Sequence, residues 1–129
     1  MSVIGKRFAM GKNLDQPINI NKLFDLTGRV AIITGGAGML GLKYAEAIAE
    51  MGGIPVLVDL KKDDCQEAAE YIHSLFNGGV LGIKADVTDK NEVSQMVQQV
   101  MERFGRIDIL VNNAALDPKF DADHTSQHL

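Results

Sequence analysis

Residues 29–41 read RVAIITGGAGMLG, and this stretch decides the fold of the chain. Its apolar run VAII ends at Thr34, and Gly35, Gly38 and Gly41 then follow at even spacing. A helical pattern begins directly afterwards. A strand, a glycine-rich turn and a helix in this order are typical of a βαβ unit that binds a dinucleotide.

Each glycine of this turn has a separate physical reason. Gly35 lets the chain reverse as it leaves the strand, because a residue without a Cβ accepts positive φ. Gly38 leaves room for a pyrophosphate to approach the backbone, and Gly41 lets the helix pack close to the strand. The amides of Gly38, Met39 and Leu40 would have no helical partner, at the end of the helix where its dipole is positive. We therefore expect an anion to bind here.

An acidic residue lies where the dinucleotide motif requires one. The next apolar run, residues 54–58, ends at Asp59, which is 24 residues after Gly35. A glycine triplet alone is equally compatible with an ordinary flexible turn. The preceding strand, the following helix and Asp59 together favour nucleotide binding.

The composition limits the class of protein. The chain has 129 residues, of which 46% are hydrophobic and 23% are charged, and this suits one globular domain. Its net charge of −4 argues against a nucleic-acid partner, which would need a basic face. No apolar run approaches the ~18 residues of a membrane helix. The single cysteine, Cys65, allows no internal disulfide, so we expect a cytoplasmic protein. Because Cys65 lies on an apolar helical stripe, we expect it to be a core residue.

Helices and strands alternate in the rest of the chain. The first helix is expected to run to about Met51 and the second to begin at a cap, Asp63 or Asp64. The third is expected to begin at Asp89, with Glu92 completing a capping box. Further strands are expected at residues 54–58, 80–85 and 107–111.

This order predicts an α/β fold, a Rossmann-type parallel sheet with flanking helices, because the strands are apolar on both faces. Right-handed crossovers give the strand order 3-2-1-4. Two helices would cover one face and only the third the other, so the doubly wound fold would be incomplete. The fourth strand would be an open edge through which the chain could associate. Residues 35–41 and 112–115 would meet where the strand order reverses, and this is where a ligand is expected.

The boundaries of the Rossmann domain are expected at residues 23 and 115. Residues 1–22 start with basic residues but contain no continuous apolar run, so a flexible extension is favoured over a signal or transit peptide. Residues 116–129 form a polar tail. His124 and His128 have a spacing that metals can use, but their polar surroundings favour a solvated tail and no metal site.

From about residue 24 to residue 118, the chain resembles the short-chain dehydrogenase/reductase family. The resemblance is carried by TGGAGMLG at 34–41, Asp59, Asp86-Val87 and Asn-Asn-Ala-Ala at 112–115. It implies a nicotinamide dinucleotide cofactor and a role for each matching position. The pyrophosphate would be cradled by the backbone amides of Gly35, Gly38, Met39 and Leu40, with Gly41 behind them. Asp59 would accept hydrogen bonds from the adenosine ribose, and Asp86 and Val87 would flank the adenine. Asn112 and Ala114 would line the floor near the nicotinamide-side ribose and hold strand 4 against strand 1.

The resemblance also bears on the choice of cofactor and substrate. The carboxylate of Asp59 would repel a 2′-phosphate, so NAD is favoured over NADP, although Lys61 and Lys62 lie close by and would soften this preference. Taken alone, Asp86 is also compatible with a helix-cap or turn aspartate. The TGxxGxxG spacing is more usual in the branch that acts on nucleotide sugars, whereas Asn-Asn-Ala-Ala is nearer the single-domain reductases. The substrate class therefore stays open.

The catalytic residues of the family are not matched. Its serine and its Tyr-x-x-x-Lys pair lie well beyond the Asn-Asn-Ala segment, and 14 residues follow Ala115 here. Neither Tyr44 nor Tyr71 has a lysine four residues later. We therefore expect the NAD(P)-binding part of an oxidoreductase, without turnover as the chain stands. The alternatives are a non-catalytic NAD-binding module and the cofactor half of a nucleotide-sugar epimerase or dehydratase.

Overall fold

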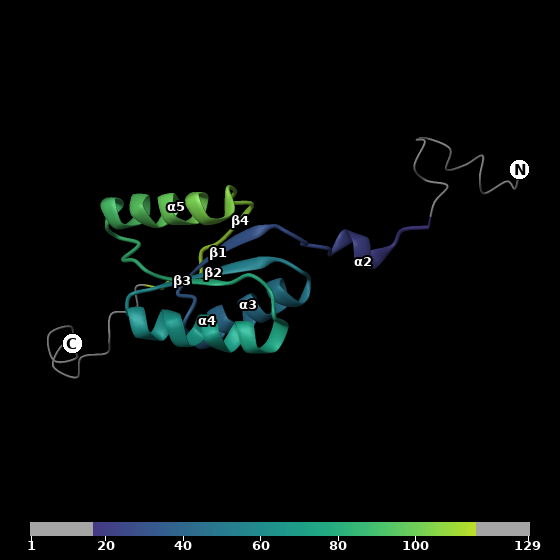
Figure 1. Cartoon of the computed structure of the whole chain (residues 1–129), viewed down its shortest axis with the longest axis horizontal. Coiled ribbons are helices and arrows are strands. Elements are labelled where there is room, and N and C mark those ends of the chain that lie inside the picture. The colour runs from purple at the N-terminus through teal and green to yellow at the C-terminus, as the bar shows by residue number, and fades with distance from the viewer. Residues whose placement is uncertain (1–16, 116–129) are drawn as a thin grey trace, which may run out of the picture.

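The computed structural model describes residues 17–115, which form a parallel sheet with helices on both faces (Figure 1). The expected tail with His124 and His128, and the extension up to residue 16, lie outside these residues. The strand order is β3-β2-β1-β4, which confirms the predicted order. The elements are α2 (Ile20–Leu23), β1 (Val30–Thr34), α3 (Met39–Glu50), β2 (Ile54–Asp59), α4 (Lys62–Phe76), β3 (Leu81–Lys84), α5 (Lys90–Phe104) and β4 (Ile109–Val111).

The two faces of the sheet carry separate hydrophobic clusters, because successive residues of a strand point to opposite faces. Val30 and Ile32 belong to the cluster on the α5 side, whereas Ile33 belongs to the cluster on the α3 and α4 side. Figure 1 shows α5 alone on one face and α3 with α4 on the other, as predicted. The helix residues in these clusters are Met96 and Val100 of α5, Ala45 of α3, and Ala68 and Ile72 of α4.

Every residue of β1 is buried, so this strand forms the centre of the core. Burying a Val or Ile side chain contributes roughly 1.5–3 kcal/mol. Cys65 is also fully buried, and its Sγ lies 3.3 Å from the carbonyl oxygen of Ile83. Burial raises the pKa of this thiol. The prediction of a core cysteine is therefore confirmed.

The longest described helices, α4 and α5, have 15 residues each. Between residues 17 and 115, no helix has the length and apolar character needed to cross a membrane.

The start of α4 differs from the prediction. Its N-cap is Lys61, whose side chain makes no capping hydrogen bond, and Asp63 and Asp64 lie inside the first turn. Two carboxylates in the first turn face the positive end of the helix dipole. They favour the helix start electrostatically instead of by capping it.

The start of β4 is held by a side chain. The carboxylate of Asp108 accepts the N–H of Val30 (2.8 Å) and two hydrogen bonds from Arg106 (2.8 and 2.7 Å). The ladder with β1 therefore begins at Ile109 and not at residue 107, because the Asp108 side chain takes the place of a backbone acceptor. Hydrogen bonds from Arg106 and Val30 lower the pKa of Asp108 to about 2.

The outer edge of β4 is exposed, as predicted. In the described part of the chain, β4 pairs with β1 alone, so its other edge has no neighbouring strand, and Leu110 in this strand is 58% exposed. Association of the chain through this edge stays a prediction.

Replacing Asp108 by asparagine should change the pH dependence of stability. The folded-state pKa is lowered to about 2, below the ordinary value of about 3.9. The ionised carboxylate therefore stabilises the fold above about pH 4, and this contribution is lost as the pH falls to about 2. Urea unfolding of the wild type and Asp108→Asn at several pH values should show a stability difference that shrinks across this window. Glu70→Gln, on the exposed surface of α4, is the control; a pH-independent difference for Asp108→Asn would contradict the assignment.

Candidate functional site

The glycine turn has the conformation that the sequence predicts. Gly35 has a φ of +62°, which an L side chain rarely adopts, and it directs the chain away from β1. The N–H of Gly36 donates to the carbonyl of Val58 (3.0 Å), so the turn is attached to β2. Gly38 is the N-cap of α3.

The three amides at the start of α3 that lack an intrahelical partner lie one residue later than predicted. Gly38 donates its N–H to the carbonyl of Gly35 (3.1 Å), because it closes a tight turn. The first helical bond runs from the N–H of Leu42 to the carbonyl of Gly38 (2.9 Å). The donors that precede it, and therefore have no intrahelical partner, belong to Met39, Leu40 and Gly41.

Gly41 is needed because α3 begins against the turn itself. A Cβ at this position would lie 2.3 Å from the carbonyl oxygen of Gly35 and 2.7 Å from the Cα of Gly36. Both neighbours are backbone atoms and cannot rotate away. The predicted close approach is therefore present, and it is made to the turn.

Asp59 faces this turn from the end of β2. One oxygen of its carboxylate accepts the N–H of Ala37 (3.1 Å), and the other accepts the N–H of Leu60 (2.8 Å). The structure thus brings together the glycines and the acidic residue that the sequence pattern singles out.

The end of β4 is attached to the same turn by Thr34 and Asn113. The Oγ1 of Thr34 accepts the N–H groups of Asn113 (3.1 Å) and Ala114 (3.0 Å) and donates to the carbonyl of Val111 (3.3 Å). The Nδ2 of Asn113 donates to the carbonyl of Gly35 (3.2 Å).

These bonds correct one expected role. Ala114 helps to hold β4 against β1, as expected, but the asparagine side chain that does so is that of Asn113. Asn112 is exposed. Thr34, which our sequence reasoning did not use as a structural residue, is the acceptor; its position directly before the first glycine was the available signal.

Asp86 and Val87 follow β3, beside Asp59. The N–H of Ala85 donates to the Asp59 carbonyl (2.9 Å), and this bond joins the two strand ends. The carboxylate of Asp86 accepts two hydrogen bonds from Thr88, from N–H (2.9 Å) and from Oγ1 (2.7 Å), and they lower its pKa. Val87 is 42% exposed.

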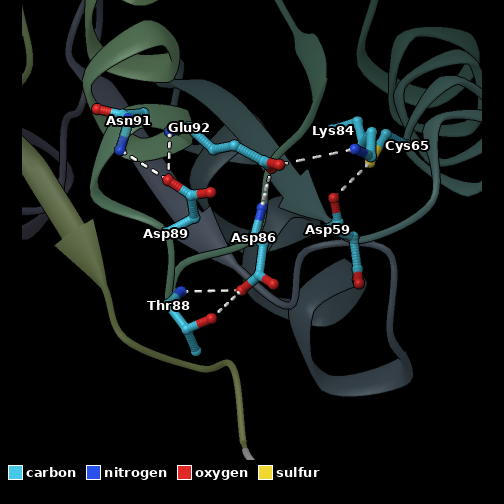
Figure 2. A network of polar contacts seen from close by, with 8 residues as sticks. All are labelled: Asp59, Cys65, Lys84, Asp86, Thr88, Asp89, Asn91 and Glu92. Carbon is cyan, nitrogen blue, oxygen red and sulfur yellow. Dashed lines mark hydrogen bonds and ion pairs between the residues drawn. The ribbon is translucent and has the colours of Figure 1, made fainter.

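The capping box after Asp86 is only half formed. Asp89 caps α5, because its Oδ1 accepts the N–H groups of Asn91 (2.8 Å) and Glu92 (3.3 Å). The prediction that the side chain of Glu92 would bond back to the N–H of Asp89 is wrong. The side chain accepts the N–H of Asp86 (2.7 Å) and pairs with Lys84 (3.9 Å), as Figure 2 shows.

A cavity of about 470 Å³ lies between α3 and α4, next to the glycine turn. It is lined by Ala37 and Met39 and by three acidic residues, Glu46, Asp64 and Glu67. Lys43, also in the lining, is paired with Glu46 at 3.0 Å. The remaining carboxylates make this side of the turn negative. In the described residues, no group of three or more His, Cys, Asp or Glu side chains could hold a metal ion.

Comparison with known proteins agrees with this geometry. The family model described as short chain dehydrogenase matches residues 29–128.

The chain belongs to the short-chain dehydrogenase family.

Among relatives in this family, a short chain dehydrogenase/reductase (dpmpG) of Macrophomina phaseolina is 35% identical over 104 residues, which cover 78% of this chain and 59% of the relative. Sorbose reductase SOU1 of Candida albicans is 37% identical over 101 residues, covering 78% and 35%. The chain thus spans between about a third and three fifths of the length of these two relatives.

Solved structures of this family share the fold. An NAD⁺-bound xylitol dehydrogenase superposes with a TM-score of 0.65 at 30% identity, covering 70% of this chain and 34% of that one. L-sorbose reductase of Gluconobacter frateurii, in complex with NADPH and L-sorbose, gives 0.69 at 36% identity, covering 79% and 40%. One of these two structures contains NAD⁺ and the other contains NADPH, so the fold that they share with this chain is an NAD(P)-binding Rossmann fold.

Removing the hydroxyl of Thr34 should weaken the attachment of β4. Thr34→Val leaves the N–H groups of Asn113 and Ala114 without their acceptor, and losing two partly buried hydrogen bonds costs about 1–3 kcal/mol in total. Thr34→Ser keeps the acceptor and removes only a methyl group, with an expected cost of roughly 0.5–1.5 kcal/mol. Urea denaturation of the two variants checks this; equal losses would show that the hydroxyl is not the important group.

Adding a methyl group at Gly41 should destabilise the turn. Gly41→Ala places a Cβ against the Gly35 carbonyl, and such overpacking typically costs 1–3 kcal/mol or somewhat more. The matched control is Gly78→Ala, where the nearest atom to an added Cβ is 3.9 Å away. We expect the control to change the free energy of unfolding by no more than about 0.5 kcal/mol. A Gly41→Ala variant as stable as this control would be evidence against the close contact.

Proposed function

We propose that this chain forms the NAD-binding part of a short-chain dehydrogenase/reductase-type oxidoreductase. The observation that carries the proposal is the convergence of the glycine turn, the Asp59 carboxylate and the end of β4 at one edge of the sheet. The family and the reversal of strand order at this edge support the same interpretation.

The residues at this edge suit a dinucleotide. The amides of Met39, Leu40 and Gly41 are donors at the positive end of α3, which suits the charged pyrophosphate. The missing Cβ atom at Gly38 leaves the backbone accessible there, whereas Gly35 and Gly41 allow the tight packing of the turn behind it. Asp59 would hold the adenosine ribose, Asp86 and Val87 would flank the adenine, and Asn112 and Ala114 would lie near the nicotinamide-side ribose. When bound, the cofactor supplies a nicotinamide ring that accepts or donates hydride.

The charges around the turn favour NAD over NADP. The carboxylate of Asp59 is fixed by two N–H donors, and Asp64 and Glu67 line the cavity next to the glycine turn. A phosphate on the ribose would meet these negative charges. Lys61 and Lys62 are exposed and are not in the lining of this cavity, which limits the extent to which they offset that repulsion.

Turnover requires more than cofactor binding. Reduction of a carbonyl needs a proton donor at the substrate oxygen. Neither tyrosine of this polypeptide is in a Tyr-x-x-x-Lys pair, and the hydroxyl of Tyr71 donates to Glu46 (3.0 Å). We therefore propose that the 129-residue polypeptide binds NAD without turning over a substrate.

The named relatives favour a dehydrogenase or reductase over a nucleotide-sugar epimerase. They include proteins named for sorbose and for xylitol, which contain a ketone and alcohols, respectively. Interconversion of an alcohol and a ketone is thus the proposed reaction class of the whole enzyme.

Asp59→Asn should weaken NAD⁺ binding and reduce the discrimination against NADP⁺. Losing a charge-assisted hydrogen bond costs about 1.5–3 kcal/mol, which corresponds to roughly a tenfold or greater rise in Kd for NAD⁺. Isothermal titration calorimetry with NAD⁺ and NADP⁺ measures both effects.

Asp63→Asn is the matched control, because it makes the same charge change at an exposed position outside the cavity lining. Its Kd values should stay within about twofold of the wild type, since surface charges contribute little. Tighter binding of NADP⁺ than of NAD⁺ by the wild type would overturn the proposed cofactor preference. Absence of binding by the folded chain to either dinucleotide would overturn the proposed function.

A further inference from the structure

We infer that Asn77 is a site of spontaneous deamidation and that a hydrogen bond from His73 holds this site in an unreactive conformation. The reaction takes water as its co-reactant and needs no enzyme. The site lies in the connection between α4 and β3, away from the sheet edge where a dinucleotide would bind, so it is independent of the proposed function.

The sequence distinguishes Asn77 from the other asparagines of the chain. Asn77 is the one asparagine that a glycine follows, in the run Asn77-Gly78-Gly79. A following glycine favours deamidation, because its backbone nitrogen has no adjacent Cβ to hinder attack on the side-chain amide. All three residues are exposed, and a Cβ added at Gly78 would meet no atom closer than 3.9 Å. The reacting atoms are therefore accessible to water and sterically open.

The reaction consists of two balanced steps. In the first, the backbone nitrogen of Gly78 loses its proton and attacks the Cγ of Asn77. A nitrogen–carbon bond forms, the bond from Cγ to the side-chain nitrogen breaks, and ammonia leaves from a five-membered succinimide. In the second, water adds to one of the two ring carbonyls and breaks its bond to nitrogen. Opening at Cγ gives aspartate, and opening at the backbone carbonyl gives isoaspartate.

The folded conformation of Asn77 is not the reactive one. Asn77 is the C-cap of α4, with a φ of 50° and a ψ of 24°, in the left-handed region that asparagine enters more readily than most residues. Ring closure requires the Gly78 nitrogen and the Asn77 Cβ to lie on the same side of the Cα–C bond. At this ψ they lie on opposite sides, so the chain must rotate about ψ of Asn77 before the ring can form.

The hydrogen bond that opposes this rotation comes from His73. The Nδ1 of His73 lies 3.2 Å from the carbonyl oxygen of Gly78. Because a carbonyl oxygen is an acceptor only, Nδ1 carries the proton and donates it. The N–H of Asn77 also donates, to the carbonyl of His73 (3.0 Å), but this bond precedes the rotating Cα–C bond. The contact from Nδ1 spans the rotating bond and must break first.

Deamidation would weaken the connection between α4 and β3. Either product carries a carboxylate at the carboxyl end of α4, where the helix dipole is negative. Isoaspartate also adds a methylene group to the main chain. The chain has little room for it, because a Cβ at Gly79 would already meet the side chain of Ile54 at 3.3 Å. The aged protein should therefore unfold at a lower urea concentration than fresh protein.

Incubation of the purified 129-residue chain in mildly alkaline buffer, followed by peptide mass spectrometry, tests the inference. The mass gain from replacing –NH₂ by –OH should accumulate at Asn77 before any other asparagine, and isoaspartyl methyltransferase should label the same peptide. In His73→Ala the rate should rise about two- to tenfold, as expected for the loss of one hydrogen bond. The matched control is Ser74→Ala, which removes a hydroxyl bonded to the Tyr71 carbonyl (2.6 Å) and should leave the rate unchanged.

Variants at the reacting residues keep the test independent of His73→Ala. Gly78→Ala adds a Cβ beside the attacking nitrogen at a place where the fold has room for it, so it should slow the reaction strongly. Asn77→Gly removes the reacting amide and suits the left-handed cap, so it should show no mass gain at residue 77. Asn77→Asp introduces the aspartate product directly and should have a lower urea midpoint than Asn77→Gly.

The deamidation site is wrong if another asparagine reacts first, or if Gly78→Ala reacts at Asn77 as fast as the wild type. The protective role of His73 is wrong if His73→Ala reacts at the rate of Ser74→Ala. It is also wrong if His73→Ala accelerates Asn113 as much as Asn77, because general destabilisation would expose both residues. None of these outcomes alters the prediction of dinucleotide binding, which calorimetry measures separately.

Discussion

Helix α3 begins so close to the end of β1 that backbone occupies the space where a side chain would otherwise lie. The Cα of Gly41 packs against the carbonyl of Gly35, and an added methyl group would overlap backbone atoms. This contact keeps the turn tight and directs the first amides of α3 toward the carboxyl ends of the strands. The arrangement of the candidate site depends on this geometry, because β2 and β4 both attach to the turn.

The polar groups around the turn are largely satisfied by the chain itself. Asp59 bonds to Ala37, Asn113 bonds to Gly35, and the hydroxyl of Thr34 uses its donor and both acceptor positions. No buried side-chain nitrogen or oxygen in residues 17–115 lacks a hydrogen-bond partner. A site built in this way is rigid before a ligand arrives, and such preorganisation lowers the entropy that binding costs.

The sheet order and the sides of the helices could be predicted because they follow from apolar patterns and crossover handedness. The details that could not be predicted depend on which of two adjacent residues faces the turn and on how far a long side chain extends. Whether Asn112 or Asn113 faces the turn depends on the pairing of Val111 with Ile33, since one residue of slip exchanges the two faces. Glu92 fits a capping box by spacing, yet its side chain reaches six residues back to Asp86. Asp63 and Asp64 stabilise α4 from within its first turn, so a cap need not be acidic.

The attachment of Thr34 to Asn113 and Ala114 joins residues 79 and 80 positions apart. On the ribosome, the glycine turn is synthesised long before its β4 partners emerge from the exit tunnel. Contacts between residues so far apart in the sequence form late in folding, because the entropic cost of closing the long loop between them must be overcome first. A nascent chain would therefore complete its nucleotide site only after residue 114 is available. Cofactor binding would then wait until β4 has paired with β1.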